Sequence, residues 1–381
     1  MTQESIQKWI WQQPDWPHFV WQDAHIQPLL RQVRLTLGIL LGKASTVSAQ
    51  VSPQAALDTL LQNIITSSAI EGETLNVQSL RSSLAKRLGL SDNAPYPTSE
   101  RTEGLSNIML DVVSNINSPL TTDRLLTWHQ WLFANTDAIW QKIRVGQWRG
   151  DEPMQVVSGR LDRPTVHFEA PPRAILEQEI TQFLQWFEQS KTNTQLDPLL
   201  RAAIVHFWFV TLHPFDDGNG RLTRALTDLA LAQVDQQSIR LYAMSAVILE
   251  KRSEYYQILE QSQRGTMDIT PWLCWFLQTL EATLQQALSN IQRTMFKKLF
   301  WQRFYELGLL PEQIKVLNRL LDGGEKGFEL GISASQYQKV AKVSKATATR
   351  HLADLVAKDC LVRSEGGGRN TRYQINGTPT A

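Results

Sequence analysis

Apolar residues recur at helical spacing along most of this chain of 381 residues. Residues 57–65, 105–116, 175–187 and 199–212 each place apolar side chains three and four positions apart, which is the spacing of one face of an α-helix. The pattern changes between residues 150 and 173, where two short β-prone runs flank a turn with glycine and proline and predict a hairpin. The sequence therefore predicts a mainly α-helical fold that carries a β-hairpin.

The composition is that of a soluble globular protein, with 42% hydrophobic and 20% charged residues. A net charge of +1 argues against a chain that is basic throughout, and the length suggests two or three domains. Cys274 and Cys360 lie far apart without metal-ligand spacing, so neither a disulfide framework nor a zinc site is indicated. The N-terminus does not resemble a secretory signal, and the apolar stretch around residues 202–212 is shorter than the ~20 residues that span a bilayer. We therefore expect a cytoplasmic protein without a membrane partner.

Residues 213–224 read HPFDDGNGRLTR, and the residue types in the first half of this segment suit phosphate chemistry. His213 titrates near neutral pH without special tuning, so it can accept a proton. Asp217 offers a hard carboxylate oxygen, which Mg²⁺ binds together with the phosphates of a substrate. We expect Phe215 to anchor the loop in the core, since that is a task for an apolar ring. The segment thus predicts a proton acceptor and a magnesium ligand close together.

The second half of the segment predicts an anion site at the start of a helix. Gly218, Asn219 and Gly220 let backbone N–H groups turn toward an anion at a helix N-terminus, where the helix dipole also favours negative charge. Arg221 and Arg224 are three positions apart, so they project from one helix face and can grip phosphate oxygens by forked hydrogen bonds.

The whole segment matches the signature HPFx(D/E)GNGRxxR and thereby resembles the Fic family. The resemblance implies a Fic-type helical core that transfers AMP from ATP to a Ser, Thr or Tyr hydroxyl of a protein substrate, which can be the protein itself. In that mechanism His213 takes the hydroxyl proton, Asp217 holds Mg²⁺, and Leu222 and Thr223 border the nucleotide through their backbone at most. The related Doc branch has lysine at the position of Gly220 and transfers phosphate, so glycine favours nucleotide transfer.

Residues 67–72, SSAIEG, resemble the inhibitory motif (S/T)xxxE(G/N) of the same family. The resemblance implies that Glu71 forms a salt bridge with Arg224 and occupies space that the γ-phosphate of ATP needs. An arginine that a carboxylate holds in a bidentate pair cannot also grip phosphate, which is consistent with this role. The alternative is that Glu71 lies on an exposed helix end, as most glutamates do.

Residues 241–260 resemble the wall around the nucleoside in this family. We expect Tyr256 to stack on or border the adenine, with Tyr242 and Tyr255 as weaker candidates, although core packing is an equal alternative for any single tyrosine. His206 lacks the third nitrogen or sulfur ligand of a zinc-type site and, like His129, is expected to be structural.

Residues 305–381 follow the order of a winged helix-turn-helix, with the second helix over residues 346–357 and two β-prone strands around GGGRN. From residue 339 to residue 372 there are eight Lys or Arg against three Asp or Glu. This local excess favours DNA as a partner, while protein docking or homodimer formation is the alternative. The second helix carries side chains that can contact phosphates or base edges, namely Thr347, Thr349, Arg350 and His351.

We therefore predict three regions. Residues 1–100 are N-terminal helices with the inhibitory segment, residues 101–300 are the Fic core with the hairpin as its flap, and residues 305–381 are the winged helix. In Fic proteins the flap registers the target segment by strand addition, for which an exposed hairpin edge is a template. Two other functions stay open: removal of AMP from a modified protein, with Glu71 positioning a water, and a DNA-binding regulator whose Fic core senses nucleotide.

Overall fold

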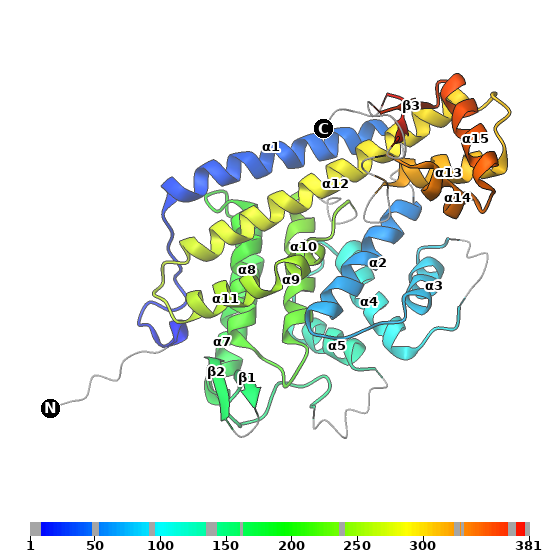
Figure 1. Ribbon diagram of the computed structural model, residues 1–381. Helices are drawn as coiled ribbons and strands as arrows, with labels where there is room; N and C mark the ends of the chain where they lie inside the picture. The colour runs from blue at the N-terminus through cyan, green and yellow to red at the C-terminus, as the bar shows by residue number, and fades with distance from the viewer. Residues whose placement is uncertain are drawn as a thin grey trace. The chain divides into compact units, whose positions relative to one another are not determined.

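The computed structural model describes residues 9–47, 53–90, 96–134, 143–160, 163–235, 241–323, 328, 331–364 and 371–377. The chain divides into two compact units, Met1–Ala287 and Leu288–Ala381 (Figure 1). The division falls within the long helix α12 (Thr270–Phe304), which contributes residues to both units. The described part of the chain is mainly helical and contains two small two-stranded sheets, which confirms the predicted mainly α-helical fold with a β-hairpin.

The first unit holds the predicted N-terminal helices, the hairpin and the loop of residues 213–218. The predicted helical runs lie in its helices, although one of them ends at Ser114, because Asn115 leaves the helical conformation. In chain order the elements before α12 are η1 (Ile10–Gln12), α1 (Asp23–Val47), α2 (Pro53–Ile70), α3 (Val77–Arg87), α4 (Glu100–Ser114), α5 (Thr122–Leu132), β1 (Gln155–Arg160), β2 (Arg163–Glu169), α7 (Arg173–Gln189), η2 (Ser190–Thr192), α8 (Pro198–Leu212), α9 (Asn219–Asp235), α10 (Met244–Glu250) and α11 (Arg252–Gln263).

Helix α8 is the centre of this unit, and it packs side by side with α9 (Figure 1). Asp197 caps its start by accepting a hydrogen bond from Leu199 N–H, and Pro198 occupies the first helical position. From Leu199 to Leu212 every side chain is buried, as expected of a helix that is apolar all round. The loop that follows α8 is therefore attached to a buried helix.

His206 lies in the middle of α8 and is confirmed as a core histidine. Its two ring nitrogens lie 2.8 Å from Thr227 Oγ1 and 2.9 Å from Tyr255 Oη. Burial lowers the pKa of His206 to about 3, so the ring is neutral at physiological pH. Of the two alternatives for Tyr255, core packing agrees with the structure, because its ring is buried and its hydroxyl pairs with this histidine.

The predicted hairpin is confirmed. Strands β1 and β2 pair antiparallel, with an irregularity in the register between Val156 and Val157. The N-terminal segment holds the base of the hairpin, since the rings of Trp9 and Phe168 meet edge-on at 5.4 Å and Trp11 Nε1 donates to the carbonyl of Glu169 at 2.7 Å. The hairpin thus has a packed base that fixes it to the first unit.

The second unit has its own core, in which aromatic residues at the end of α12 pack with apolar residues of the helices that follow. The elements follow the predicted order, and the predicted turn at residues 366–370 lies outside the described residues. His351 is buried and bonded to Tyr337 Oη at 3.0 Å, so its prediction as a nucleic-acid contact is wrong. After α12 the elements are α13 (Pro311–Asp322), α14 (Ala334–Ala341), α15 (Lys345–Ala357), β3 (Leu361–Arg363) and β4 (Tyr373–Ile375).

A search of the described residues for a membrane-spanning helix is negative, since none of their helices is both long enough and apolar enough to cross a bilayer.

Candidate active site

The loop between α8 and α9 is closed by the side chain of Asn219. Its Oδ1 accepts from Phe215 N–H at 2.9 Å, and its Nδ2 donates to Phe215 C=O at 2.8 Å. Asn219 is buried and both ends of its amide are engaged, so its side chain shapes the loop and only its backbone faces the predicted anion site. Gly218 precedes it with φ +84°, a left-handed conformation that glycine adopts without strain.

The stacked rings of Phe215 and His129 hold this loop in place. The ring of Phe215 is fully buried, as predicted, and stacks on His129 with 4.1 Å between centroids. His129 Nδ1 accepts from Gly146 N–H at 2.9 Å, so Nε2 carries the proton and donates to the carbonyl of Asp217 at 3.2 Å. Burial lowers the pKa of His129 to about 4, which keeps the ring neutral. This histidine is structural, as expected, and it holds the backbone of the predicted magnesium ligand.

His213 ends α8 in a left-handed conformation, with φ 47° and ψ 57°. Its Nδ1 lies 3.1 Å from the carbonyl of Val210, so Nδ1–H donates and the lone pair lies on Nε2. Burial lowers the pKa of His213, since a charged imidazolium is disfavoured away from water. The ring is therefore a neutral base at physiological pH, with Nε2 as the accepting atom.

Arg149 supports the same turn and was not found by the sequence analysis. Its Nε donates to the carbonyl of His213 at 2.9 Å, its backbone N–H donates to Pro214 C=O at 2.9 Å, and its Nη2 donates to Pro171 C=O. The side chain is almost fully buried, and burial lowers its pKa to about 10, so it stays charged. No local pattern marks an arginine whose partners are backbone carbonyls elsewhere in the chain.

Helix α2 brings the predicted inhibitory segment onto α9. Arg224 Nη2 donates to Glu71 Oε1 at 2.8 Å and to Ser67 C=O at 2.8 Å, while Arg224 Nε donates to Ser67 Oγ at 2.8 Å. Ser67 lies in the last turn of α2 and Glu71 directly follows the helix, and both residues contact the same guanidinium. Burial alone would raise the pKa of Glu71, but the charge and hydrogen bond of Arg224 hold it below its usual value.

The carboxylate of Glu71 occupies the predicted anion site. A Cβ atom at Gly220 would lie only 2.0 Å from Glu71 Oε1 and 3.2 Å from Arg224 Nη1. The carboxylate therefore lies against the backbone of the first turn of α9, where a helix attracts an anion. Arg224 Nη1 and Arg221 Nε are buried and have no hydrogen-bond partner among the described residues, so the site retains donors for further oxygen atoms.

Asp217 and Arg221 complete the turn. The Asp217 side chain is 54% exposed, its Oδ1 accepts from Gly218 N–H, and it lies 3.6 Å from Arg221 Nη2. The described residues contain no group of three His, Cys, Asp or Glu side chains that could hold a metal ion. One exposed carboxylate beside a phosphate site fits Mg²⁺, which binds through one or two carboxylates and the phosphates of its substrate.

The tyrosine wall is only partly as predicted. Tyr256 is 37% exposed, and its hydroxyl lies 3.4 Å from Glu71 Oε2, so it borders the anion site. Tyr242 is buried, which agrees with the alternative of core packing for this weaker candidate. Leu222 and Thr223 are also fully buried, which agrees with the expectation that their side chains point away from the site.

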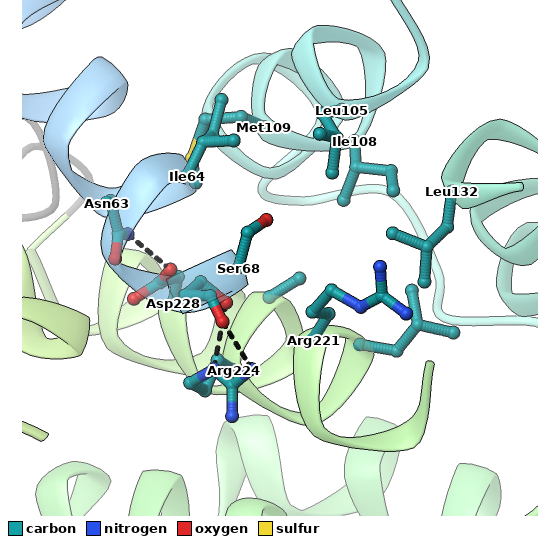
Figure 2. Close-up of a pocket in the computed structure, with 13 residues that line it drawn as sticks. Asn63, Ile64, Ser68, Leu105, Ile108, Met109, Leu132, Arg221, Arg224 and Asp228 are labelled. Atoms are coloured by element: carbon teal, nitrogen blue, oxygen red, sulfur yellow. Dashed lines mark hydrogen bonds between the residues drawn. The ribbon is translucent and has the colours of Figure 1, made fainter. Parts of the chain in front are cut away.

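A small pocket of about 40 Å³ lies behind the two arginines, among α2, α4, α5 and α9 (Figure 2). Ser68 Oγ points into it and has no partner among the described residues. At its far side Asn63 Nδ2 donates to Asp228 Oδ2 at 2.6 Å, a second buried bond between α2 and α9. Burial raises the pKa of Asp228 to about 7. Helix α2 therefore forms hydrogen bonds to α9 at two places, from Asn63 to Asp228 and between Ser67 and Arg224.

Comparison with known proteins agrees with this geometry. A family model described as Fic/DOC family matches residues 119–231, which include the whole loop and the start of α9. A second model, described as a domain of unknown function (DUF4172), matches residues 9–90 and so covers α1, α2 and Glu71.

Curated relatives and a solved structure point the same way. The chain is 26% identical over 227 residues to protein adenylyltransferase fic-1 of Caenorhabditis elegans, covering 59% of this chain and 40% of that protein. It is 28% identical over 241 residues to protein adenylyltransferase Fic of Drosophila mojavensis, covering 62% and 42%. The chain thus spans about two fifths of the length of these relatives. A Fic family protein from Desulfovibrio desulfuricans G20 shares the fold, with a TM-score of 0.53, 20% identity, and coverage of 93% of this chain and 98% of that one.

The fold and the loop define a helical protein with an anion site at the start of a buried helix. Within this chain, residues 119–231 match the model of the Fic/DOC family.

The position of the Glu71 carboxylate can be tested without any assay of activity. We expect Gly220→Ala to lower the free energy of unfolding by about 1–3 kcal/mol, because the new methyl group displaces the carboxylate from buried Arg224. In a Glu71→Gly background the same change should be neutral or stabilising, since alanine is the better helix former. Urea unfolding of the four proteins, followed by circular dichroism, measures both effects; an equal cost in the two backgrounds would contradict the assigned geometry.

Proposed function

We propose that this chain transfers AMP from ATP to a Ser, Thr or Tyr hydroxyl of a protein, with its own hydroxyls among the acceptors. The observation that supports this most is the anion site itself. A carboxylate already lies where phosphate would bind, against Gly220 and Arg224, and a neutral histidine base lies at the start of the same loop. The curated relatives that share this region are named protein adenylyltransferases, which agrees with the proposal.

The proposed reaction uses His213 as the base. Its Nε2 takes the proton from the incoming hydroxyl, whose oxygen attacks the α-phosphorus of ATP; the new P–O bond forms as the bond to pyrophosphate breaks. The backbone N–H groups at the start of α9 and the guanidinium of Arg221 stabilise the charge on the phosphates. Catalysis of this kind depends mainly on positioning and charge stabilisation.

Asp217 would hold Mg²⁺ in this proposal, with its exposed carboxylate facing the phosphates. The ion would neutralise charge on the phosphates of ATP. The hydrogen bond from His129 fixes the backbone of Asp217, so the carboxylate starts from a defined position.

Glu71 would inhibit the transfer. While its carboxylate holds Arg224, the γ end of ATP cannot use that arginine, and ATP binds without the geometry needed for attack. A surface salt bridge is worth about 0–1 kcal/mol, but this carboxylate also fills the substrate's own space, so its removal should matter more. The 2% exposed Arg224 side chain is well shielded from water.

The same geometry supports a second candidate reaction at this site. Glu71 Oε2 is not engaged by Arg224 and faces the Tyr256 hydroxyl at 3.4 Å, so it can orient a water for removal of AMP from a modified protein. Incubating a purified AMP-modified target with the wild-type and Glu71→Gly proteins tests this. Loss of AMP release in the variant would support removal of AMP as the second reaction. Unchanged release would show that Glu71 has no role in that reaction.

His213→Ala should abolish transfer in the activated Glu71→Gly protein. Loss of a general base costs about 10² to 10⁴ in rate, whereas binding of ATP should persist, since the arginines and the start of α9 remain. Labelling of protein by [α-³²P]ATP measures the rate, and isothermal titration measures ATP binding. His25→Ala, a change at an exposed histidine of α1, is the matched control and should leave both unchanged. Labelling by the His213→Ala protein at the parent rate would show that another group is the base.

The rate should depend on pH through His213. The neutral ring is the base, so activity is present above its pKa and lost as the pH falls through that value. Because burial lowers this pKa, kcat/KM of the Glu71→Gly protein should hold down to the ordinary histidine pKa of about 6.5 and fall only in more acidic buffer. Initial labelling rates between about pH 5 and pH 9 give the profile. A midpoint above the ordinary histidine value would contradict the assignment.

We further propose that the second unit is a winged helix that binds DNA through α15. Lys345, Thr349 and Arg350 are exposed near the start of this helix, where the helix dipole also attracts phosphate. These three residues belong to the segment 339–372, in which Lys and Arg outnumber Asp and Glu. Protein docking through the same surface is the alternative outcome of the test.

Binding to duplex DNA should weaken steeply between about 50 and 200 mM salt, because phosphate contacts release counterions. A gel-shift titration with the full chain measures this. The double change Lys345→Ala and Arg350→Ala should reduce binding and its salt dependence, while Lys315→Ala on α13 serves as the control. Absence of salt-sensitive binding to any duplex would assign the unit to protein docking.

A further inference from the structure

The chain at the end of α2 places a second carboxylate, Glu73, on the other phosphate-binding arginine. Glu73 Oε2 accepts from Arg221 Nη1 at 2.8 Å. Its Oε1 accepts from Arg101, in the first turn of α4. Glu73 lies outside the six-residue inhibitory motif, so neither the motif nor the role proposed for Glu71 accounts for this contact.

The turn that ends α2 explains why Glu73 returns to α9. Glu73 N–H donates to Ser68 C=O at 3.0 Å and Gly72 N–H donates to Ala69 C=O at 3.0 Å, with Gly72 at φ +79°. This is the Schellman arrangement, in which a left-handed glycine reverses the chain just after a helix. The reversal sends Glu73 back toward the helix that Glu71 already contacts.

The two carboxylates match the two arginines. Arg221 and Arg224 are three positions apart and lie on one face of α9, and Glu73 and Glu71 lie on either side of the glycine that reverses the chain. Each carboxylate lies 2.8 Å from a guanidinium nitrogen of its arginine on α9. Both arginine side chains are buried, at 8% and 2% exposure, and each keeps one N–H without a partner among the described residues.

We propose that Glu73 is a second inhibitory carboxylate, which masks Arg221 while Glu71 masks Arg224. The inference rests on the proposed binding of ATP phosphates at this site. A guanidinium that donates to Glu73 cannot direct the same N–H to a phosphate oxygen. Arg101 keeps Glu73 in place, because its positive charge offsets that of the carboxylate next to the anion site. Removal of Glu71 alone should therefore leave the protein partly inhibited.

The test compares four full-length proteins: wild type, Glu71→Gly, Glu73→Gln and the double variant. Isothermal titration with ATP and Mg²⁺ gives the dissociation constant, and labelling by [α-³²P]ATP gives the rate. Glu73→Gln keeps the size of the side chain and removes its charge; Glu73→Ala repeats the test by truncation. Glu103→Gln is the matched control, since Glu103 pairs with Arg87 at a similar degree of exposure away from the site. Thermal unfolding shows which proteins are folded.

We expect the double variant to bind ATP about tenfold more tightly than Glu71→Gly, which is the scale of one charged hydrogen bond, and to be labelled faster. Glu103→Gln should change neither quantity in the same background. A double variant that binds no more tightly than Glu71→Gly would overturn the inference. One that binds more weakly would also overturn it, since Glu73 would then orient Arg221 for phosphate.

The two readouts separate this inference from the proposed function. Tighter ATP binding without labelling of any protein would support a masking role for Glu73 and contradict the transferase. Efficient labelling by Glu71→Gly, unchanged when Glu73 is also replaced, would support the transferase and contradict the masking role.

Discussion

The ion pair between Arg224 and Glu71 joins the parts of the first unit that matter for its chemistry. Arg224 is 2% exposed, and a buried guanidinium requires acceptors in place of water. Ser67 supplies two and Glu71 supplies the negative charge, all from the end of α2. The position of α2 and the state of the anion site are therefore coupled. A polyphosphate that takes over Arg224 has to replace the carboxylate, and α2 then loses one of its attachments to α9.

Three histidines near this site, of which His129 and His206 are buried and His213 is half-buried, differ in their hydrogen-bond partners. Burial lowers the pKa of each, so all three are neutral. His129 and His206 use both ring nitrogens for hydrogen bonds inside the protein. His213 uses Nδ1 alone among the contacts of the described residues, and its Nε2 is left to accept a proton. The lowered pKa is therefore common to all three, and the Nε2 that the described residues leave unengaged is what supports His213 as the proposed base.

The sequence predicted the helices, the hairpin and the loop because each depends on local patterns. Apolar periodicity marks α8, and the glycines and arginines of the loop are contiguous, so their joint geometry follows from one helix start. The pairing of Glu71 with Arg224 was predicted by resemblance to a motif and agrees with the geometry.

Contacts between distant segments could not be predicted in this way. Arg149 binds backbone carbonyls 22 and 64 positions away, and such acceptors leave no mark in the residue types. Glu73 reaches Arg221 across 148 positions. For Tyr255 the sequence left nucleoside contact and core packing open, because an amphipathic helix offers the same spacing for either. Only the hydrogen bond between Tyr255 and His206 in the folded chain distinguishes a core ring from a nucleoside contact.

The proposed function depends most on Glu71 standing in for part of ATP at a nucleotidyl-transfer site. Parallel incubations of wild type and Glu71→Gly with ATP labelled at either the α- or the γ-phosphate test it directly. We expect protein to become labelled from the α-position only, and more strongly with Glu71→Gly than with wild type. Label transferred from the γ-phosphate, or equal α-labelling by the two proteins, would contradict it.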